Sequence, residues 1–319
     1  MSLPPGTVFD MPDLHDMIAA IQNRAVGALL GLAVGDALGT TLEFKRRDSY
    51  EPLTDLQGGG PFGLQPGEWT DDTAMALALA DSLHADAALN PADLMQRFVS
   101  WYERGTYSCT GHCFDIGATT RQALQRWQRN GDPYAGSAEP HTAGNGSLMR
   151  LAPVAIRHWR NEARLFDVAA RQSRTTHAAP EAVDACMAYA QLLAEAIQGH
   201  PVAEVLKPRS AHYAGAIAPI MAGAWRGKPR NQIAATGYVA HSLEASLWCV
   251  ARTASFEQAV LLAANLGEDA DTTAAITGQL AGALYGANAI PERWLAKLAW
   301  HPRIRALAET LFQSSMGQG

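Results

Sequence analysis

The stretch Gly27-Ala-Leu-Leu-Gly31-Leu-Ala-Val-Gly35-Asp36-Ala-Leu-Gly39 is apolar apart from one aspartate, and it repeats glycine at every fourth position. A spacing of four places these glycines along one face of a helix. Each glycine in a helix interior costs about 1 kcal/mol relative to alanine, so a row of four needs a reason. A second segment has the same spacing at Gly278, Gly282 and Gly286. We therefore predict two helices, each with a face against which another backbone packs closely.

Apolar residues with helical spacing dominate the rest of the chain as well. Alternating runs of β-branched residues, which would indicate strands, are nearly absent. Glycine- and proline-rich stretches near 131–146 and 207–231 are expected to be long loops. We predict an all-α protein with helices near residues 13–39, 72–87, 91–104, 115–129, 162–173, 180–198, 239–251, 255–265, 272–287 and 303–314.

The composition indicates one large core and an acidic surface. The 319-residue chain is 48% hydrophobic and 18% charged, with a formal net charge of −6. We expect a single domain over residues 21–319, preceded by an N-terminal extension, residues 1–20. The densest basic cluster is Lys45-Arg46-Arg47, and Asp48 follows it directly. Proteins that grip nucleic acid show a basic face or stripe, so no nucleic-acid partner is expected.

Neither the N-terminus nor the cysteines indicate export. The N-terminus lacks a basic region followed by an apolar run, so no signal peptide is expected. The apolar stretch from Ala25 to Gly35 is too short to cross a bilayer. Four cysteines do not make a disulfide scaffold in a chain this long, and the pair Cys109–Cys113 lacks the spacing of a zinc site. We expect a cytoplasmic protein with reduced cysteines and no membrane partner.

Two motifs place acidic and hydroxyl side chains at the start of alanine-rich helices. The first is Trp69-Thr70-Asp71-Asp72-Thr73, and the second is Glu268-Asp269-Ala270-Asp271-Thr272-Thr273. Either one alone fits a helix cap. Together they favour a metal site, because carboxylate and hydroxyl oxygens suit hard cations such as Mg²⁺ or Mn²⁺. Glu43 is a further candidate, with a solvated surface residue as the alternative, and Asp36 fits a hydrogen-bonded core position equally well.

The segment Gly144-Asn145-Gly146-Ser147-Leu148-Met149-Arg150 is rich in glycine and precedes an expected helix. Exposed backbone N–H groups at such a place can hold phosphate oxygens, and a plain turn is the alternative. The segment is not a phosphate-binding loop of the Walker type, since no Gly-Lys-Ser/Thr follows the spaced glycine. The pattern alone assigns no role to His177 or Asp115, because isolated residues of these types are more often structural.

Taken in order, these strings resemble the ADP-ribosylglycohydrolase family, including its bacterial dinitrogenase reductase-activating branch. The resemblance runs from about residue 24 to 287 and covers the first glycine-striped segment with Glu43, both acidic motifs, Cys113-Phe-Asp115-Ile-Gly117, the segment 144–150 and His177. One departure is Glu268, where many relatives have glycine. The resemblance implies a compact multi-helix orthogonal bundle with two divalent cations, Mg²⁺ or Mn²⁺.

The resemblance also implies roles for individual residues. The metal ligands would be Glu43, Thr70, Asp71, Asp72, Asp269, Asp271 and Thr272. The catalytic residues would be Glu43, Asp72 and Asp115. The residues that bind substrate would be Asn145, Gly146, Ser147 and His177.

The implied activity is metal-dependent hydrolysis of the glycosidic bond between ADP-ribose and a protein side chain, with arginine as the favoured linkage. An ADP-ribosylated protein would be the substrate, and an ADP-ribosyltransferase is a further candidate partner. Two alternatives remain. The chain could bind and neutralise an ADP-ribosyltransferase, or it could be a metal-dependent phosphoester or nucleotide hydrolase.

Overall fold

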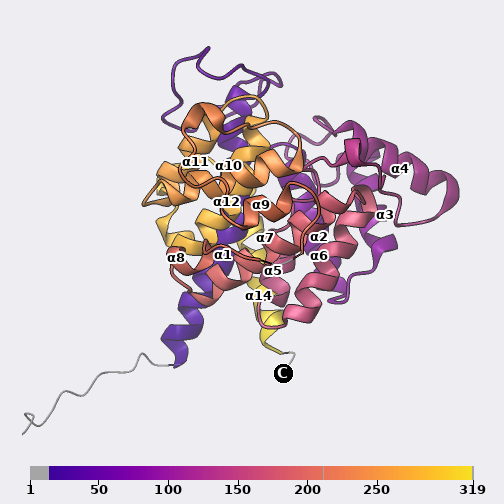
Figure 1. The fold of residues 1–319 in the computed structure, drawn as a ribbon. Coiled ribbons are helices and arrows are strands. Elements are labelled where there is room, and N and C mark those ends of the chain that lie inside the picture. The colour runs from indigo at the N-terminus through magenta and orange to yellow at the C-terminus, as the bar shows by residue number, and fades with distance from the viewer. Residues whose placement is uncertain (1–13, 211, 318–319) are drawn as a thin grey trace, which may run out of the picture.

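The computed structural model describes residues 14–210 and 212–317, and within these ranges every helix or strand assigned is a helix (Figure 1). The α-helices are α1 (Leu14–Gly39), α2 (Asp71–Ala85), α3 (Pro91–Arg104), α4 (Ala118–Asn130), α5 (Ala152–His158), α6 (Glu162–Thr176), α7 (Pro180–Gln198), α8 (Val202–Val205), α9 (Ile217–Met221), α10 (Val239–Ala251), α11 (Phe256–Ala264), α12 (Ala270–Tyr285), α13 (Glu292–Leu295) and α14 (His301–Met316). In the described ranges, β interactions are limited to three isolated bridges. The all-α prediction is confirmed.

The two glycine-striped helices, α1 and α12, pack against each other. A Cβ atom on Gly31 would overlap the carbonyl oxygen of Gly278, and one on Gly282 would overlap that of Gly27. Further along, the backbone at Gly39 lies against the start of α12. The two helices therefore run antiparallel, and the C-terminal end of α1 meets the N-terminal end of α12. This pairing brings Asp36 and Glu43 beside the acidic motif at residues 268–273.

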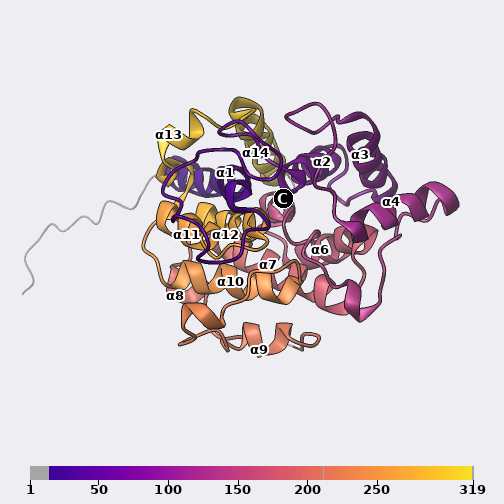
Figure 2. The same ribbon diagram turned by 90° about the horizontal axis from the view of Figure 1, so that it is seen from above.

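The α1–α12 pair forms the centre of the molecule. Fifteen consecutive residues of α1, from Ala25 to Gly39, are buried. On its other sides α1 contacts α5, α7, α11 and α14, while α12 contacts α7, α10 and α11. Figure 2 shows α12 beside α1, with α10 beyond it. The helices α2, α3, α4 and α6 form the other side of the molecule.

The apolar character of α1 has its explanation in this packing. Residues Leu14–Leu42 are long and apolar enough to cross a membrane by length and composition, with a mean hydropathy of 1.6, although the expectation had considered only the shorter stretch Ala25–Gly35. However, 94% of the apolar window is buried inside the protein. Its apolar side chains are thus used by the core.

Two local expectations differ from the structure, and one agrees with it. The helix expected from residue 115 begins at Ala118, because Asp115 has a left-handed backbone (φ 57°). Segment 144–150 forms turns, and α5, the helix expected after it, begins at Ala152. Of the expected N-terminal extension, residues 1–13 lie outside the described residues, and residues 14–20 form the first turns of α1.

Candidate active site

One cavity of about 690 Å³ lies where the end of α1, the start of α2 and the start of α12 meet. It is lined by Glu43, Phe44, Asp71, Asp115, Ile116, Gly117, Ala118, Thr119, Thr120, Gly144, Asn145, Gly146, Met149, His177, Thr236, Gly237, Glu268, Asp269, Asp271 and Thr272. Most of the residues that the sequence nominated therefore reach the same cavity. Thr70, Asp72 and Ser147 are buried and do not line it.

Asp36 on α1 holds the start of α2 from outside that helix. One of its carboxylate oxygens accepts hydrogen bonds from the backbone N–H (2.9 Å) and hydroxyl (2.9 Å) of Thr70. The other accepts from the backbone N–H (3.0 Å) and hydroxyl (2.6 Å) of Thr73. Burial and the nearby charge of Asp271 raise the pKa of Asp36 to about 7. Of the two open readings for Asp36, the hydrogen-bonded core position is the one observed.

Glu43 holds the start of α12 in the same way as Asp36 holds the start of α2. Its Oε2 atom accepts hydrogen bonds from the backbone N–H groups of Ala270 (2.8 Å) and Asp271 (3.4 Å). The side chain is buried, so the alternative of a solvated surface glutamate was wrong. Burial, followed by the charge of Asp271, raises the pKa of Glu43 to about 12.

Two groups of carboxylates share Asp271. Asp36, Asp72 and Asp271 form one group, and Glu43, Asp269 and Asp271 form the other; in each, one oxygen per residue lies within 4.8 Å of the others. Burial and mutual repulsion raise the pKa of Asp71 and of Asp72 well above its ordinary value. So many carboxylates cannot all be ionised at short range without a compensating positive charge.

Asp72 gives a specific reason to assign that positive charge to metal ions. Its Oδ1 atom is buried and has no hydrogen-bond partner among the described residues. Its Oδ2 atom accepts only long hydrogen bonds, from the hydroxyls of Thr70 (3.4 Å) and Thr272 (3.3 Å). A buried carboxylate oxygen without a partner is costly, and a divalent cation would satisfy it. The donor set therefore fits hard divalent cations.

Asp115 reaches the same carboxylates from the loop before α4. Burial and the charges of Asp71 and Asp271 raise its pKa to about 11. Its backbone is left-handed (φ 57°), as is that of Glu268 (φ 62°). Such conformations in residues other than glycine are strained and are frequent at functional sites. Their position on the cavity wall fits that pattern.

The neutral wall of the cavity is formed by Gly144, Asn145, Gly146 and His177. The side-chain amide of Asn145 donates hydrogen bonds to Asp269 (2.7 Å) and to Ser242 (2.8 Å), which ties this wall to the acidic one. Gly146 lies so close to His177 that an added Cβ would stand 2.7 Å from the imidazole Cε1. The Ser147 hydroxyl instead points behind the wall, where it pairs with Ser173 (2.8 Å).

His177 is kept neutral mainly by burial, and Arg150, a residue whose role the sequence did not reveal, helps to orient it. Burial, followed by the charge of Arg150, lowers the pKa of His177 to about 3. The fully buried Arg150 donates to the carbonyl of Gly146 (3.2 Å) and to the hydroxyl of Thr176 (2.9 Å). That hydroxyl lies 2.9 Å from His177 Nδ1. Nδ1 of His177 is thus paired with Thr176, while Nε2 lies beside Gly144 and Gly146 on the cavity wall.

Comparison with known proteins identifies the family. The ADP-ribosylglycohydrolase family profile matches residues 17–319. The ADP-ribosylarginine hydrolases Tri1 of Pseudomonas putida and Serratia proteamaculans are 48% and 46% identical over 290 residues, covering 91% of this chain and 78% and 79% of theirs. The ADP-ribosyl-[dinitrogen reductase] glycohydrolase of Rhodospirillum rubrum is 33% identical, covering 88% of this chain and 91% of its own.

A solved structure described as an ADP-ribosylglycohydrolase-related protein complex has a TM-score of 0.84 and 42% identity, and covers 93% of this chain and 100% of that one. The profile match and the similar fold agree with the acidic cavity at the ends of α1, α2 and α12. The chain belongs to the ADP-ribosylglycohydrolase family.

Proposed function

We propose that this protein hydrolyses the N-glycosidic bond between ADP-ribose and an arginine side chain of a protein, with two divalent cations, Mg²⁺ or Mn²⁺. The observation that carries the proposal is the pair of carboxylate groups joined through Asp271, which lines the same cavity as Gly146 and His177. Relatives named ADP-ribosylarginine hydrolases, at 46–48% identity, support the choice of arginine.

The cations would be held by Glu43, Thr70, Asp71, Asp72, Asp269, Asp271 and Thr272. When bound, they supply Lewis acidity, which offsets the repulsion among the carboxylates and makes water a better nucleophile. With the carboxylates ionised, the cavity carries negative charge where the ribose would lie. That charge stabilises the positive charge that develops on a sugar ring during glycosidic cleavage.

The neutral wall would bind the pyrophosphate. The backbone N–H of Gly146 and Nε2 of His177 would be the donors there, and a neutral histidine donates without carrying charge. Asn145 would position this wall, because both protons of its side-chain amide are already donated to Asp269 and Ser242. Ser147 would contribute through its backbone, because its side chain points away from the cavity. Asp115 would accept a hydrogen bond from a ribose hydroxyl.

In the reaction, water adds its oxygen to the anomeric carbon as the bond from that carbon to the guanidine nitrogen breaks. The water proton moves to a carboxylate, for which Glu43 and Asp72 are the candidates. The guanidine leaves with the electron pair of the broken bond and then takes up that proton, so the carboxylate is regenerated. The products are free ADP-ribose and unmodified arginine.

The test is to incubate the purified protein with ADP-ribosyl-arginine in Mg²⁺, Mn²⁺ or chelator, and to identify the products by mass. Release of intact ADP-ribose that depends on metal supports the proposal. Release of AMP or phosphate would instead indicate a phosphoester hydrolase. Intact substrate under every condition would overturn the choice of arginine.

A further inference from the structure

Three phenylalanine side chains form a strip that begins at the cavity wall, and the proposed reaction uses none of them. Phe44 is 68% exposed, and its ring meets that of Phe62 at 6.3 Å between centroids. The ring of Phe62 meets that of Phe114 at 5.2 Å. The three residues come from three separate loops, and Phe44 lines the cavity itself. We call these residues the phenylalanine strip.

Phe44 is held in place at a conformational cost. Its backbone is left-handed (φ 61°), which is strained for a residue with a Cβ atom. Two backbone hydrogen bonds maintain it, from Phe44 N–H to the carbonyl of Glu268 (2.8 Å) and from Glu268 N–H to the carbonyl of Lys45 (2.8 Å). The strained turn thus presents a large apolar ring to solvent, where it gains nothing from the core.

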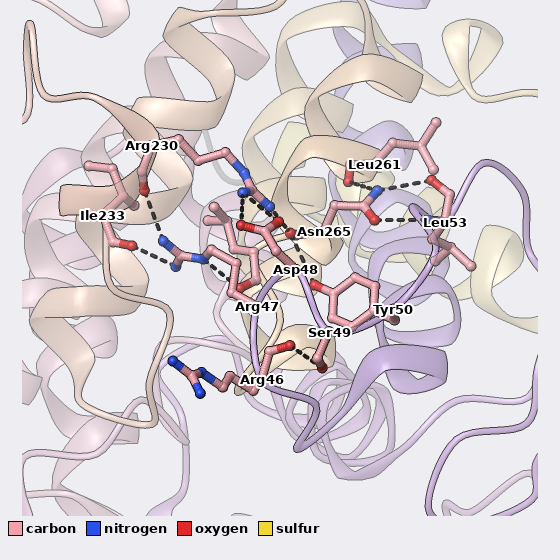
Figure 3. A network of polar contacts seen from close by, with 11 residues as sticks. Arg46, Arg47, Asp48, Ser49, Tyr50, Leu53, Arg230, Ile233, Leu261 and Asn265 are labelled. Atoms are coloured by element: carbon pink, nitrogen blue, oxygen red, sulfur yellow. Dashed lines mark hydrogen bonds and ion pairs between the residues drawn. The ribbon is translucent and has the colours of Figure 1, made fainter.

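A network of polar contacts fastens the loop that follows Phe44 (Figure 3). The guanidinium of Arg47 donates to the backbone carbonyls of Leu266 (2.8 Å), Arg230 (2.8 Å) and Ile233 (2.6 Å). The guanidinium of Arg230 in turn pairs with Asp48 (2.7 Å).

The same network continues along the loop. The hydroxyl of Tyr50 donates to the carbonyl of Asn265 (3.1 Å), and the side-chain oxygen of Asn265 accepts from Leu53 N–H (2.8 Å). These contacts join residues 45–53 to the segments that precede α10 and α12. Phe44 therefore stands on a fastened loop, which suits a fixed recognition surface.

The chemistry around Phe44 favours a planar cation. Its neighbours on the cavity wall include Glu43 and Glu268. An aromatic face next to carboxylates attracts a guanidinium through both cation–π and Coulomb interactions. Phe44 belongs to the acidic end of the cavity, whereas the proposed pyrophosphate donors belong to Gly146 and His177. Whatever is attached to the anomeric carbon would leave the cavity on the acidic side.

We infer that the phenylalanine strip binds the arginine-bearing segment of the protein substrate. Phe44 contacts the guanidinium of the modified arginine, and Phe62 and Phe114 contact the polypeptide that flanks it. This inference rests on the proposed function, because it takes the arginine linkage as given. It adds a surface that recognises the modified side chain and its polypeptide in addition to the ADP-ribose.

The test uses two substrates, a short peptide carrying one ADP-ribosyl-arginine and free ADP-ribosyl-arginine. The variants are Phe44→Gly, Phe44→Leu and Phe62→Ala. Glycine is favoured at φ 61°, so Phe44→Gly removes the ring with no expected loss of thermal stability. Leu14→Ala is the matched control, because Leu14 is 69% exposed and lies at the far end of α1, about 39 Å along that helix.

We expect Phe44→Gly and Phe44→Leu to raise KM for the peptide by roughly 3- to 30-fold, the size of a cation–π contact. The kcat of either variant should stay within about twofold, and the affinity for free ADP-ribose should not change. Phe62→Ala should raise KM for the peptide and leave KM for free ADP-ribosyl-arginine unaltered. An unchanged KM for the peptide in both Phe44 variants overturns the inference, as does an equal loss of affinity for free ADP-ribose.

A binding measurement separates this inference from the proposed function. In the presence of chelator, fluorescence anisotropy gives the affinity of a labelled ADP-ribosylated peptide, with free ADP-ribose as competitor. Wild type should bind the peptide more tightly than ADP-ribose, and Phe44→Gly should remove that preference. If the peptide is never hydrolysed but its tighter binding relative to ADP-ribose depends on Phe44, the proposed function is wrong and the phenylalanine strip is still supported as a binding surface. If the peptide is hydrolysed but binds no more tightly than ADP-ribose, the proposed function is supported and the inference on the phenylalanine strip is wrong.

Discussion

At the scale of single residues, Asp72 carries the clearest consequence, because one of its oxygens is buried without a partner. Replacing Asp72 with asparagine should lower activity by on the order of 100-fold or more. In chelator the same variant should melt at a higher temperature than wild type, since the neutral amide removes repulsion that raises the pKa of Asp72. Activity assays and thermal melts measure both effects.

The exposed Glu51 gives a control of the same charge, and Glu51→Gln should change neither quantity. An Asp72→Asn protein that retains full activity would remove this residue from the proposed metal site. A lower melting temperature in chelator would show that the carboxylate is needed for folding in the absence of metal.

His177 should make the protein sensitive to acid. Its pKa is lowered to about 3 in the folded protein, against about 6.5 when unfolded, so the unfolded chain binds a proton between these values that the folded chain does not. Stability is therefore lost as pH falls from 6.5 toward 3. Between pH 7 and 4.5, wild type should lose on the order of 2 kcal/mol more than His177→Gln.

Denaturant unfolding at the two pH values measures this difference. His84→Gln, at an exposed position on α2, is the matched control and should follow wild type. Equal pH dependence of wild type and His177→Gln would show that His177 is not held neutral.

The residues that sequence reasoning located and those that it missed differ in a physical way. The oxygen-rich motifs were visible because hydroxyls and carboxylates at two helix starts are more than capping needs, and the structure gathers Asp71, Asp269 and Asp271 at one cavity. Arg150 was missed because its partners, the carbonyl of Gly146 and the hydroxyl of Thr176, are defined only by tertiary structure. The sequence could not show that the Ser147 hydroxyl points away from the cavity, because its partner, Ser173, is also defined only by tertiary structure.

At the scale of elements, the α1–α12 contact depends on the absence of side chains. Gly31→Ala would place a Cβ atom against the carbonyl oxygen of Gly278 and 2.9 Å from the ring of Phe256, so the two helices must separate. We expect a loss of about 2–3 kcal/mol in the free energy of unfolding, as in overpacked cores. Activity should also fall, because Asp36 and Glu43 lie at the end of the same helix.

Gly117→Ala is the matched control, because a Cβ atom on Gly117 meets nothing within 4 Å and its φ is −60°. Denaturant unfolding of both variants tests the contact. A Gly31→Ala protein as stable as Gly117→Ala would show that α1 and α12 tolerate greater separation.

Glycine spacing predicted both helices and the face of each that packs closely, but not that the two faces meet. A row of four glycines indicates only that the backbone of some other helix packs closely there. It does not identify that helix, because an all-α chain contains many. A helix was expected after segment 144–150, but α5 (Ala152–His158) is too brief to give a clear periodic pattern, so its bounds could not be predicted.

At the scale of the whole molecule, divalent cations should stabilise the fold if the proposed site is correct. A ligand that binds only the folded state at 100 times its Kd adds about 2.7 kcal/mol. Mg²⁺ or Mn²⁺ should therefore raise the melting temperature of chelator-treated protein, and Asp269→Asn should reduce the rise. Identical melts with and without these ions would contradict the metal assignment, and K⁺ at equal ionic strength controls for salt.

The antiparallel pairing of α1 with α12 also has a consequence for synthesis of the protein. Its two halves, Leu14–Gly39 and Ala270–Tyr285, are separated by about 230 residues, and the carboxylates meet only where these helices meet. A chain emerging from the ribosome holds Asp36, Glu43 and Asp72 long before Asp269 and Asp271 exist. If these carboxylates act together as proposed, the nascent polypeptide can gain activity only after Asp269 and Asp271 have been synthesised.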